Sequence, residues 1–345
     1  MTRLHELTRF LEQLAPSSYQ ESYDNARLIV GDPQMEITGV LCSLDCTEAI
    51  IDEAMERDCN VVVAHHPIVF RGLKSLTGRD YVERTVLRAI KNDVAIYAIH
   101  TNLDAIQTGV NAKICERIGI TNPRILSPKG NLKRLTVWCK KGDVSTLVEK
   151  LTAAGAGTVN GERGRVFAVD GVGAGNGETR KETQLDFLFP APAQGQILRE
   201  LPKIIRYEIV ETQVTDREVG SGMIGELFEE MSGRDFLEYL KNVMKTGTIR
   251  HTELPDRPVR RVAVCGGAGS FLLRKAMAAK ADFFVTADYK YHEFFDADGR
   301  IVIADIGHYE SEQFTGELLR DRIAEKFSTF AARLAKTNTN PVRYF

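Results

Sequence analysis

Residues 60–67, NVVVAHHP, constrain the fold more than any other stretch of this chain. Residues 61–63 form a short, uniformly apolar and β-branched run, which is typical of a strand buried on both faces of a parallel sheet. The run ends in His65 and His66, and Pro67 holds the backbone of His66 extended. On an extended backbone the two imidazoles diverge unless the chain turns there. Diverging imidazoles would bind two metal ions, or one would bind an ion and the other a residue that supports the ligands. The alternative is a loop in which one histidine ring is stacked and the other is exposed to solvent.

Apolar runs of strand length alternate with segments of helical periodicity on both sides of this stretch. The predicted strands are residues 40–44, 61–64, 94–99, 262–265, 282–286 and 301–306, and the predicted helices are residues 3–14, 47–57, 80–91 and 228–244. A strand, a helix and a second strand in this order form a βαβ unit, whose strands are parallel. The outer parts of the chain therefore predict an α/β fold with a mostly parallel sheet.

The middle of the chain has a different pattern. Residues 131–216 read strand–helix–strand twice, the order of a ferredoxin-like α+β module, and the glycine-rich segment 171–181 is typical of a mobile turn. We therefore expect an insert domain at 131–216, between a first part (1–130) and a second part (217–345) of a metal-binding α/β domain. The insert has no histidine and no acidic cluster at ligand spacing, which favours a role in assembly, gating or small-ligand sensing.

Composition and charge argue against several classes of protein. The 345 residues are 43% hydrophobic and 27% charged, with a net charge of −2, as in an ordinary soluble globular protein. This charge argues against a nucleic-acid-coating protein, and no apolar run is long enough to cross a bilayer. Six cysteines without a CxxC pair predict reduced thiols that act as small buried hydrophobes. Because the N-terminal segment also lacks the apolar core of a secretion signal, we expect a cytoplasmic protein.

Side chains that bind metals recur where the predicted strands end, which is where open α/β sheets bind their ligands. His100 and Asp104 lie just past the third predicted strand. Asp45 follows the first, and is either the N-cap of the next helix or part of a site. Asp288 and His292 follow the fifth, and their spacing fits either a helix-surface pair or a site. We expect these strand ends to meet at one edge of a common sheet.

The strongest single motif is IVIADIGHYESE, residues 301–312, at the last predicted strand. Gly307 permits a turn, and the helix that follows places His308 and Glu312 one turn apart on the same face. An imidazole and a carboxylate at this spacing commonly hold Zn, Mn or Fe, although a pair of this kind on its own is more often a surface contact. Glu310 lies about 200° around the helix from His308, so it is expected to face away.

A glycine-rich turn, GGAGS at residues 266–270, follows the fourth predicted strand. Its backbone N–H groups and the next helix N-terminus suit an anion, but the turn matches neither a Walker loop nor a GxGxxG fingerprint. The alternative is a tight strand-to-helix turn. Taken together, the nitrogen and oxygen side chains at the strand ends, without a thiolate, describe a dinuclear site for borderline metals.

Several segments of the outer parts resemble signature blocks of the NIF-three-like family, also called the GTP cyclohydrolase type 2 homologues. They are ESYDNARLIVGDP (21–33), SLDCTEAIIDEA (43–54), VVVAHHPIVFRGLKSL (61–76), AIYAIHTNLDA (95–105), TADYKYHEFFDA (286–297) and IADIGHYESE (303–312). Their order and spacing are specific, and the insert resembles the PII/CutA-like domain of the longer members. One departure is Arg27 after Ala26, where the family usually has a glycine before the leucine.

The resemblance implies a three-layer domain with two divalent metal ions per subunit (Zn, Mn, Fe or Ni). The positions that match the family's ligands are His65, His66, Asp104, His308 and Glu312, with Glu312 as the bridge. It also implies a ring-shaped homohexamer whose sites face an inner cavity. GTP cyclohydrolase activity is attached to the family by name, and metal-dependent phosphoester hydrolysis is another activity that would fit.

Two hypotheses for the function follow. In the first, the protein is a metal-dependent hydrolase of a nucleotide-like or phosphorylated substrate, and His100 or His292 shuttles a proton. For GTP, the attack would fall on C8 of the purine. In the second, the protein is a non-enzymatic hexameric scaffold, a metallochaperone or a regulatory protein that binds metal without turnover. The absence of an evident base, nucleophile or phosphate loop beside the ligands motivates the second hypothesis.

Overall fold

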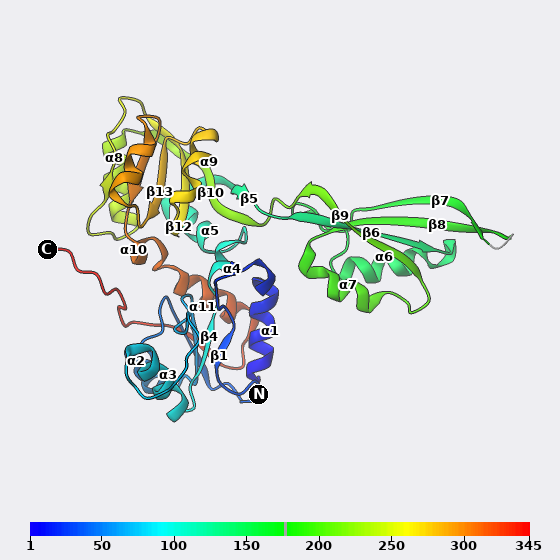
Figure 1. The fold of residues 1–345 in the computed structure, drawn as a ribbon, viewed down its shortest axis with the longest axis horizontal. Helices are drawn as coiled ribbons and strands as arrows, with labels where there is room; N and C mark the ends of the chain where they lie inside the picture. Colours follow the sequence, from blue (N-terminus) through cyan, green and yellow to red (C-terminus); the bar gives the residue numbers. More distant parts are fainter. Residues whose placement is uncertain (176–177) are drawn as a thin grey trace. The chain divides into compact units, whose positions relative to one another are not determined.

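The computed structural model describes residues 1–175 and 178–345. The chain forms two compact units: residues 1–127 pack together with residues 221–345, and residues 128–220 form a unit of their own. The elements of both units are labelled in Figure 1. Across the described residues, no helix has both the length and the apolar character needed to cross a bilayer.

Five strands form the first sheet of the larger unit. In spatial order they are β1 (Leu28–Val30), β4 (Ala95–Ala98), β3 (Val61–Ala64), β2 (Gly39–Ser43) and β15 (Ala331–Leu334). The strands from β4 to β15 are parallel, and β1 is antiparallel to β4. Every residue of β2, β3 and β4 is buried, as expected for a sheet covered on both faces. One face packs on α2 (Glu48–Glu56) and α3 (Tyr81–Lys91), which lie side by side in Figure 1.

The second sheet of this unit has six strands. Their order is β11 (Arg250–His251), β14 (Val302–Asp305), β13 (Phe283–Ala287), β12 (Val259–Ala268), β10 (Gly220–Met231) and β5 (Ile120–Pro128). β12, β13 and β14 are parallel, β10 is antiparallel to β12, and β11 is antiparallel to β14. The outer face packs on α9 (Leu273–Ala278) and the 3-10 helix η5 (Tyr291–Ala297). The expectation of one common sheet is therefore wrong, because the chain leaves the first sheet after β4 and enters the second at β5.

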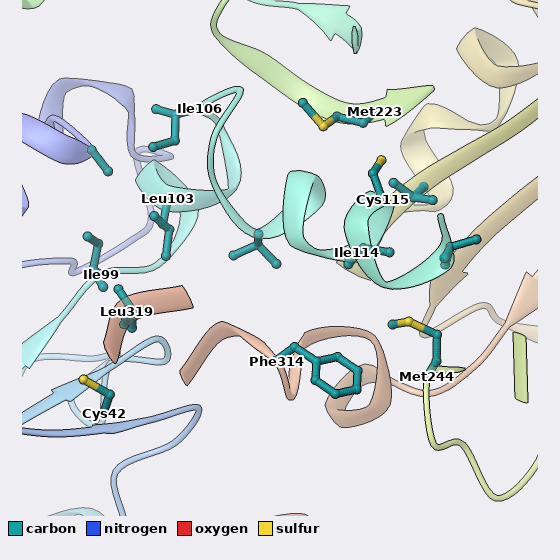
Figure 2. Close-up of a cluster of buried hydrophobic side chains, with 14 of the residues drawn as sticks. Cys42, Ile99, Leu103, Ile106, Ile114, Cys115, Met223, Met244, Phe314 and Leu319 are labelled. Atoms are coloured by element: carbon teal, nitrogen blue, oxygen red, sulfur yellow. The ribbon is translucent and has the colours of Figure 1, made fainter. Parts of the chain in front are cut away.

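One hydrophobic core lies between the two sheets. Its helical side chains come from α1 (Leu4–Leu14), α4 (Thr101–Asp104), α5 (Val110–Ile118), α8 (Gly233–Val243) and α11 (Thr315–Lys326). Figure 2 shows part of it, where Ile114 and Cys115 of α5 lie in the same cluster as Cys42 of β2 and Phe314, which precedes α11. Side chains from both sheets thus share one core, which is why the two sheets form one unit. All six cysteines are free and buried, as predicted.

The smaller unit is built on a four-stranded antiparallel sheet. Its elements along the chain are β6 (Asn131–Cys139), α6 (Val144–Ala153), β7 (Val166–Gly175), β8 (Glu178–Phe189), α7 (Gln194–Glu200) and β9 (Arg206–Thr215). The strand order is β7-β8-β6-β9. Leu147 and Leu151 of α6 and Ile197 of α7 pack in one core with Phe187 of the sheet. The observed order of elements is therefore βαββαβ.

Two local predictions are wrong. The helix expected at 228–244 begins only at Gly233 of α8, because the Ser232 hydroxyl accepts the N–H of Asp235 as an N-cap, and residues 228–231 belong to β10. The glycine-rich segment 171–181 is largely paired strand, since β7 and β8 stay in register from Val166↔Phe187 to Gly175↔Glu178. Residues 176–177 of that predicted turn lie outside the described residues.

Glu53 of α2 anchors the segment that follows β15. Its carboxylate accepts the backbone N–H groups of Lys336 (2.8 Å) and Thr337 (2.8 Å) and pairs with Arg57 (2.5 Å). Burial alone would raise the pKa of Glu53, but these hydrogen bonds lower the pKa to about 2. The same segment carries Thr339, whose hydroxyl contacts the Asp45 carboxylate (2.5 Å). Glu53 thus holds the C-terminal segment against the first sheet.

Replacing Glu53 with glutamine should lower the free energy of unfolding by about 2 kcal/mol at pH 7, measured by urea denaturation. Because the pKa of Glu53 is lower in the folded chain than in the unfolded chain, its contribution is present above about pH 4.5 and is lost as the pH falls toward 2. The gap between wild type and variant should therefore shrink between pH 5 and pH 3. Glu56→Gln, exposed on the same helix, is the control. An equal gap at both pH values would contradict the prediction.

Candidate metal centre

The two histidines after β3 turn toward the same space instead of diverging. The N–H groups of His65 and His66 donate to the carbonyls of Ser43 (3.2 Å) and Leu44 (2.9 Å), so pairing with the β2 side continues while the chain bends. The ring centroids of the two histidines lie 5.0 Å apart at an angle of 40°. The bend after β3 therefore brings both imidazoles to the carboxyl end of the first sheet.

Four imidazoles meet here, and each is hydrogen-bonded at Nδ1. The partners are the Ile99 carbonyl for His65 (2.8 Å), Asp45 for His66 (2.8 Å), Asp24 for His100 (2.8 Å) and Asp288 for His308 (2.6 Å). A bond at Nδ1 fixes the orientation of the ring and leaves Nε2 for another partner. Histidines that ligate a metal through Nε2 are usually held in this way by a carboxylate or a carbonyl.

Glu312 joins the two sheets at this point. It lies on α10 (His308–Glu312), after β14 of the second sheet, and its carboxylate is buried. The Oε2 atom is 3.0 Å from Nε2 of His66, from the first sheet, and 3.2 Å from Nε2 of His308, one turn earlier on the same helix. A single carboxylate oxygen therefore lies between two imidazoles that follow strands of different sheets.

His65 and Asp104 carry two buried atoms without a hydrogen-bond partner. Nε2 of His65 and Oδ1 of Asp104 lie 3.5 Å apart, and neither is hydrogen-bonded within the described part of the chain. Since Nδ1 of His65 donates to the Ile99 carbonyl, its Nε2 carries a free lone pair. Buried polar atoms of this kind are costly unless something satisfies them. A nitrogen and an oxygen lone pair facing one small space fit a cation.

The pKa values of the ionisable groups at this centre are shifted in different directions. Burial lowers the pKa of His65 to about 3, so this ring is neutral. Burial would also lower the pKa of His66 and of His308, but hydrogen bonds to carboxylates raise them to about 9 and about 11. The same bonds from His308 and His66 hold the pKa of Glu312 well below its usual range, against the effect of burial. Burial, with the charge of Glu312, raises the pKa of Asp104.

Three overlapping groups bring their ligand atoms within 4.8 Å of one another. They are His65 with His66 and His100, His66 with His308 and Glu312, and His65 with Asp104 and Glu312. All of these ligand atoms are imidazole nitrogens or carboxylate oxygens, which suit Zn, Mn, Fe and Ni. Together with the two unpartnered atoms, this donor set fits a divalent metal ion.

The glycine-rich segment at the end of β12 lies against Glu312. Two of its N–H groups are used within the chain, because Gly266 donates to Asn111 (3.0 Å) and Gly267 to Ser311 (2.9 Å). Gly267 has φ +60°, and a Cβ there would lie 2.7 Å from Oε1 of Glu312. β12 runs to Ala268 and the 3-10 helix η4 (Ser270–Leu272) follows after Gly269, which agrees with the tight strand-to-helix connection of the two alternatives; Gly267, within the strand, makes room for the Glu312 carboxylate.

A comparison with family models decides the membership of the chain. Residues 2–341 match the model described as Duf34/NIF3 (NGG1p interacting factor 3). The chain belongs to the Duf34/NIF3 family. The family resemblance of the sequence blocks is thereby confirmed.

Several relatives can be aligned with this chain over nearly its whole length. A Staphylococcus epidermidis protein named GTP cyclohydrolase 1 type 2 homolog is 28% identical over 99% of this chain and 100% of its own length. A Bacillus subtilis protein of the same name is 28% identical over 98% of each chain. Among solved structures, a Bacillus cereus protein related to NIF3 has a TM-score of 0.88 at 28% identity, covering 100% of this chain and 99% of its own. A Staphylococcus aureus protein has a TM-score of 0.81 at 27% identity, covering 100% and 99%.

In this NIF3-family chain, the structure brings together the five residues predicted as ligands. His65, His66, Asp104, His308 and Glu312 each belong to at least one of the three groups described above. They come from both sheets, from the ends of β3 and β14 and from the short helix α4. Their meeting depends on the packing of the two sheets and not on one shared sheet edge.

The two histidines predicted as proton shuttles lie in different surroundings. His100 joins His65 and His66 in one of the groups. His292 is exposed, its ring contacts are with Tyr291 (5.1 Å between centroids) and Phe295 (6.5 Å), and it belongs to none of the groups found among the described residues. The centre therefore includes His100 and not His292.

Two carboxylates near the centre, Asp45 and Asp288, had two possible roles from the sequence, and a third, Glu310, was expected to face away. The helix cap beside Asp45 is Thr47, while Asp45 itself binds His66, so Asp45 belongs to the site. Asp288 binds His308, not the nearby His292. Glu310 accepts a hydrogen bond from Asn340 (3.0 Å) and belongs to none of the groups above, so it faces away from them as predicted.

Asp24 was missed. Its side chain is fully buried and binds His100 and both the backbone and the hydroxyl of Thr101. Burial alone would raise its pKa, but these bonds lower the pKa of Asp24 to about 2. Asp24 lies in a loop 76 residues before His100, so no spacing rule could pair them. The neighbouring departure from the family pattern, Arg27, keeps its backbone pairing, because its carbonyl accepts the N–H of Ala98 (2.9 Å).

A pocket of about 450 Å³ opens beside the centre. Its lining includes His66 and His308 with their partners Asp45 and Asp288, together with Arg250 and Tyr344. Pockets of about 300–1,000 Å³ bind small molecules. The candidate metal centre is therefore open to a ligand of that size.

Proposed function

We propose that this protein is a metal-dependent hydrolase of a nucleotide or phosphoester, with two divalent ions in each subunit. The observation that carries the proposal is the shared carboxylate of Glu312, which belongs to two of the three ligand groups. One ion would be held by His65, Asp104 and Glu312, and the other by His66, His308 and Glu312. Two ions in such a site lower the pKa of a bound water and stabilise negative charge that develops on the substrate.

The residues around these ligands have defined tasks in the proposal. Asp45 and Asp288 hold His66 and His308 through Nδ1, which keeps each Nε2 directed at Glu312. Asp24 holds Nδ1 of His100 in the same way, so Nε2 of His100 is the atom that would accept or donate a proton beside the substrate. His292 as a proton shuttle stays a prediction that these contacts do not support.

The names of relatives support the same class of reaction. Proteins 28% identical to this one over nearly its full length are named GTP cyclohydrolase 1 type 2 homolog, and a GTP cyclohydrolase is a hydrolase of a purine nucleotide. GTP is therefore the first substrate to test, beside simple phosphoesters. The metal could be Zn, Mn, Fe or Ni, since the donor set suits all four.

The proposal is tested by loading the purified protein with each metal in turn and assaying GTP and a panel of phosphoesters. Turnover that needs metal and stops on chelation supports the hydrolase. Tight metal binding without turnover of any substrate would contradict it and favour the non-enzymatic scaffold or metallochaperone.

Replacing His100 with glutamine should lower kcat about 100-fold with the same amount of bound metal, because a positioned acid or base contributes about 10²–10⁴-fold. His5→Gln, a histidine on α1, is the matched control and should keep full activity. If His100→Gln loses metal in proportion to activity, the residue is a ligand and not a proton shuttle.

We also propose that residues 128–220 form the ferredoxin-like, PII/CutA-like insert expected from the sequence; the βαββαβ order supports it. The ring-shaped homohexamer implied by the family resemblance stays a prediction, as does the cytoplasmic location. Light scattering of the purified protein measures the first: a mass about six times that of the 345-residue chain is expected, and a monomer would contradict it.

A further inference from the structure

Two exposed aromatic rings stand together near the centre. Tyr23 is 62% exposed and Phe70 is 48% exposed. Their ring centroids lie 6.1 Å apart at 36°, a tilted pair. Tyr23 belongs to the loop before β1, and Phe70 to the loop between β3 and α3, so the pair forms only in the folded chain. Two large rings left in contact with water have area to offer to a ligand.

Hydrogen bonds made by Asp24 and Asn25, which follow Tyr23 in the chain, hold this pair in place. Asp24, next to Tyr23, has a fully buried side chain bound to His100 and Thr101. Asn25 donates from its side-chain amide to the carbonyl of Val69, the residue before Phe70, at 2.8 Å. The segments that carry the two rings are thus tied both to the centre and to each other. Because these hydrogen bonds already hold the segments, less conformational entropy of the two loops is lost when a ligand binds to the rings.

The pair is continuous with the candidate metal centre through His100. The ring of Phe70 lies 6.2 Å from that of His100 in an edge-to-face arrangement. The His100 ring is in turn 5.2 Å from His65 and 5.3 Å from His66. An unbroken row of rings therefore runs from solvent to the candidate ligands. A molecule lying on the outer rings would reach the centre with its other end.

Two positively charged side chains lie in the same loop as Phe70, the exposed ring of this row. Arg71 and Lys74 follow Phe70 in the same loop, and both are exposed. Neither forms an ion pair with a carboxylate within residues 1–175 and 178–345. The loop therefore offers cations as well as a ring, a combination that suits a compound with a planar ring and phosphate groups.

We propose that Tyr23 and Phe70 bind the base of a nucleotide substrate by stacking and so determine specificity for nucleotides over phosphoesters without a ring. The inference rests on the proposed function, because it assigns the substrate class of that same site. Stacking on aromatic side chains tolerates different bases, since every base has a π face. The pair thus selects for a planar ring. With the base held there, the phosphate end of the molecule reaches the centre, so the inference goes with phosphoester hydrolysis in the proposed function and not with attack on C8 of the purine.

The test measures binding, not turnover. Metal-loaded wild type, Tyr23→Ala and Phe70→Ala are titrated with GTP, ATP and tripolyphosphate in a calorimeter. Each alanine variant should bind both nucleotides about 10-fold more weakly than wild type and tripolyphosphate equally well. Tyr23→Phe and Phe70→Tyr, which keep a ring, should restore nucleotide binding. Tyr81→Ala, with the same exposed fraction of 62%, is the control and should bind like wild type.

Wild type that binds GTP no better than tripolyphosphate would overturn the inference, and so would alanine variants that lose both ligands equally. A change in particle mass in the alanine variants with unchanged nucleotide affinity would overturn it too, because the pair would then be a contact between copies of the chain. Failure of the proposed function looks different: nucleotide binding would still depend on the two rings, but no substrate would be turned over.

Discussion

Replacing Glu312 with glutamine should lower the affinity for both proposed metal ions about 100-fold or more and remove the proposed metal-dependent turnover. Glu312 lies 3.0 Å from His66 and 3.2 Å from His308, and belongs to two ligand groups, so one substitution weakens both proposed positions. Glutamine keeps the shape but has no negative charge to offset the metal. Loss of residues that only orient ligands costs about 10–100-fold, and a shared ligand should cost at least as much.

The measurement is the molar ratio of metal to protein after dialysis against a weak chelator. Glu310→Gln is the matched control, because Glu310 lies two residues away on the same helix and binds Asn340. It should keep the wild-type metal content. If Glu312→Gln retains two ions per chain, or turns over every substrate as fast as wild type, the proposed centre is wrong.

A methyl group at Gly267 should also disrupt the centre, although Gly267 has no ligand atom on a side chain. Its Cβ would lie 2.7 Å from Oε1 of Glu312 and 3.2 Å from Cε1 of His308, distances that force the Glu312 carboxylate to move. The left-handed backbone, with φ +60°, adds about 1 kcal/mol of strain. We expect Gly267→Ala to lower the free energy of unfolding by about 2–3 kcal/mol and the metal affinity at least about 10-fold.

Gly299→Ala separates the two effects. Gly299 has a similar backbone, with φ +64°, but a Cβ there would meet no atom within 4 Å. This variant should lose about 1 kcal/mol from strain alone and keep its full metal content. Equal metal affinity in both variants would show that the glycine at the end of β12 does not support Glu312. Urea denaturation of the metal-free proteins and metal titration supply the two readouts.

The sequence by itself determined most of the local structure of the outer parts. The apolar, β-branched residues 61–63 form the buried strand β3, and the pattern of IVIADIGHYESE places His308 and Glu312 one turn apart on α10, as observed. These features depend on residues close in the chain, whose hydrophobic period and turn residues are readable directly. One local prediction was wrong: the helix expected from residue 228 begins only after its N-cap Ser232, and residues 228–231 belong to β10.

Only the tertiary structure decided which of these residues meet. His66 and Glu312 are 246 residues apart and follow strands of different sheets, yet their side chains lie 3.0 Å from each other because both sheets share one core. Asp24 reaches His100 from a loop, and a lone carboxylate in a loop has no periodicity to mark its partner. The strand ends were visible in the sequence because strands are local, whereas the contacts between them arise from packing of distant segments, which no spacing along the chain records.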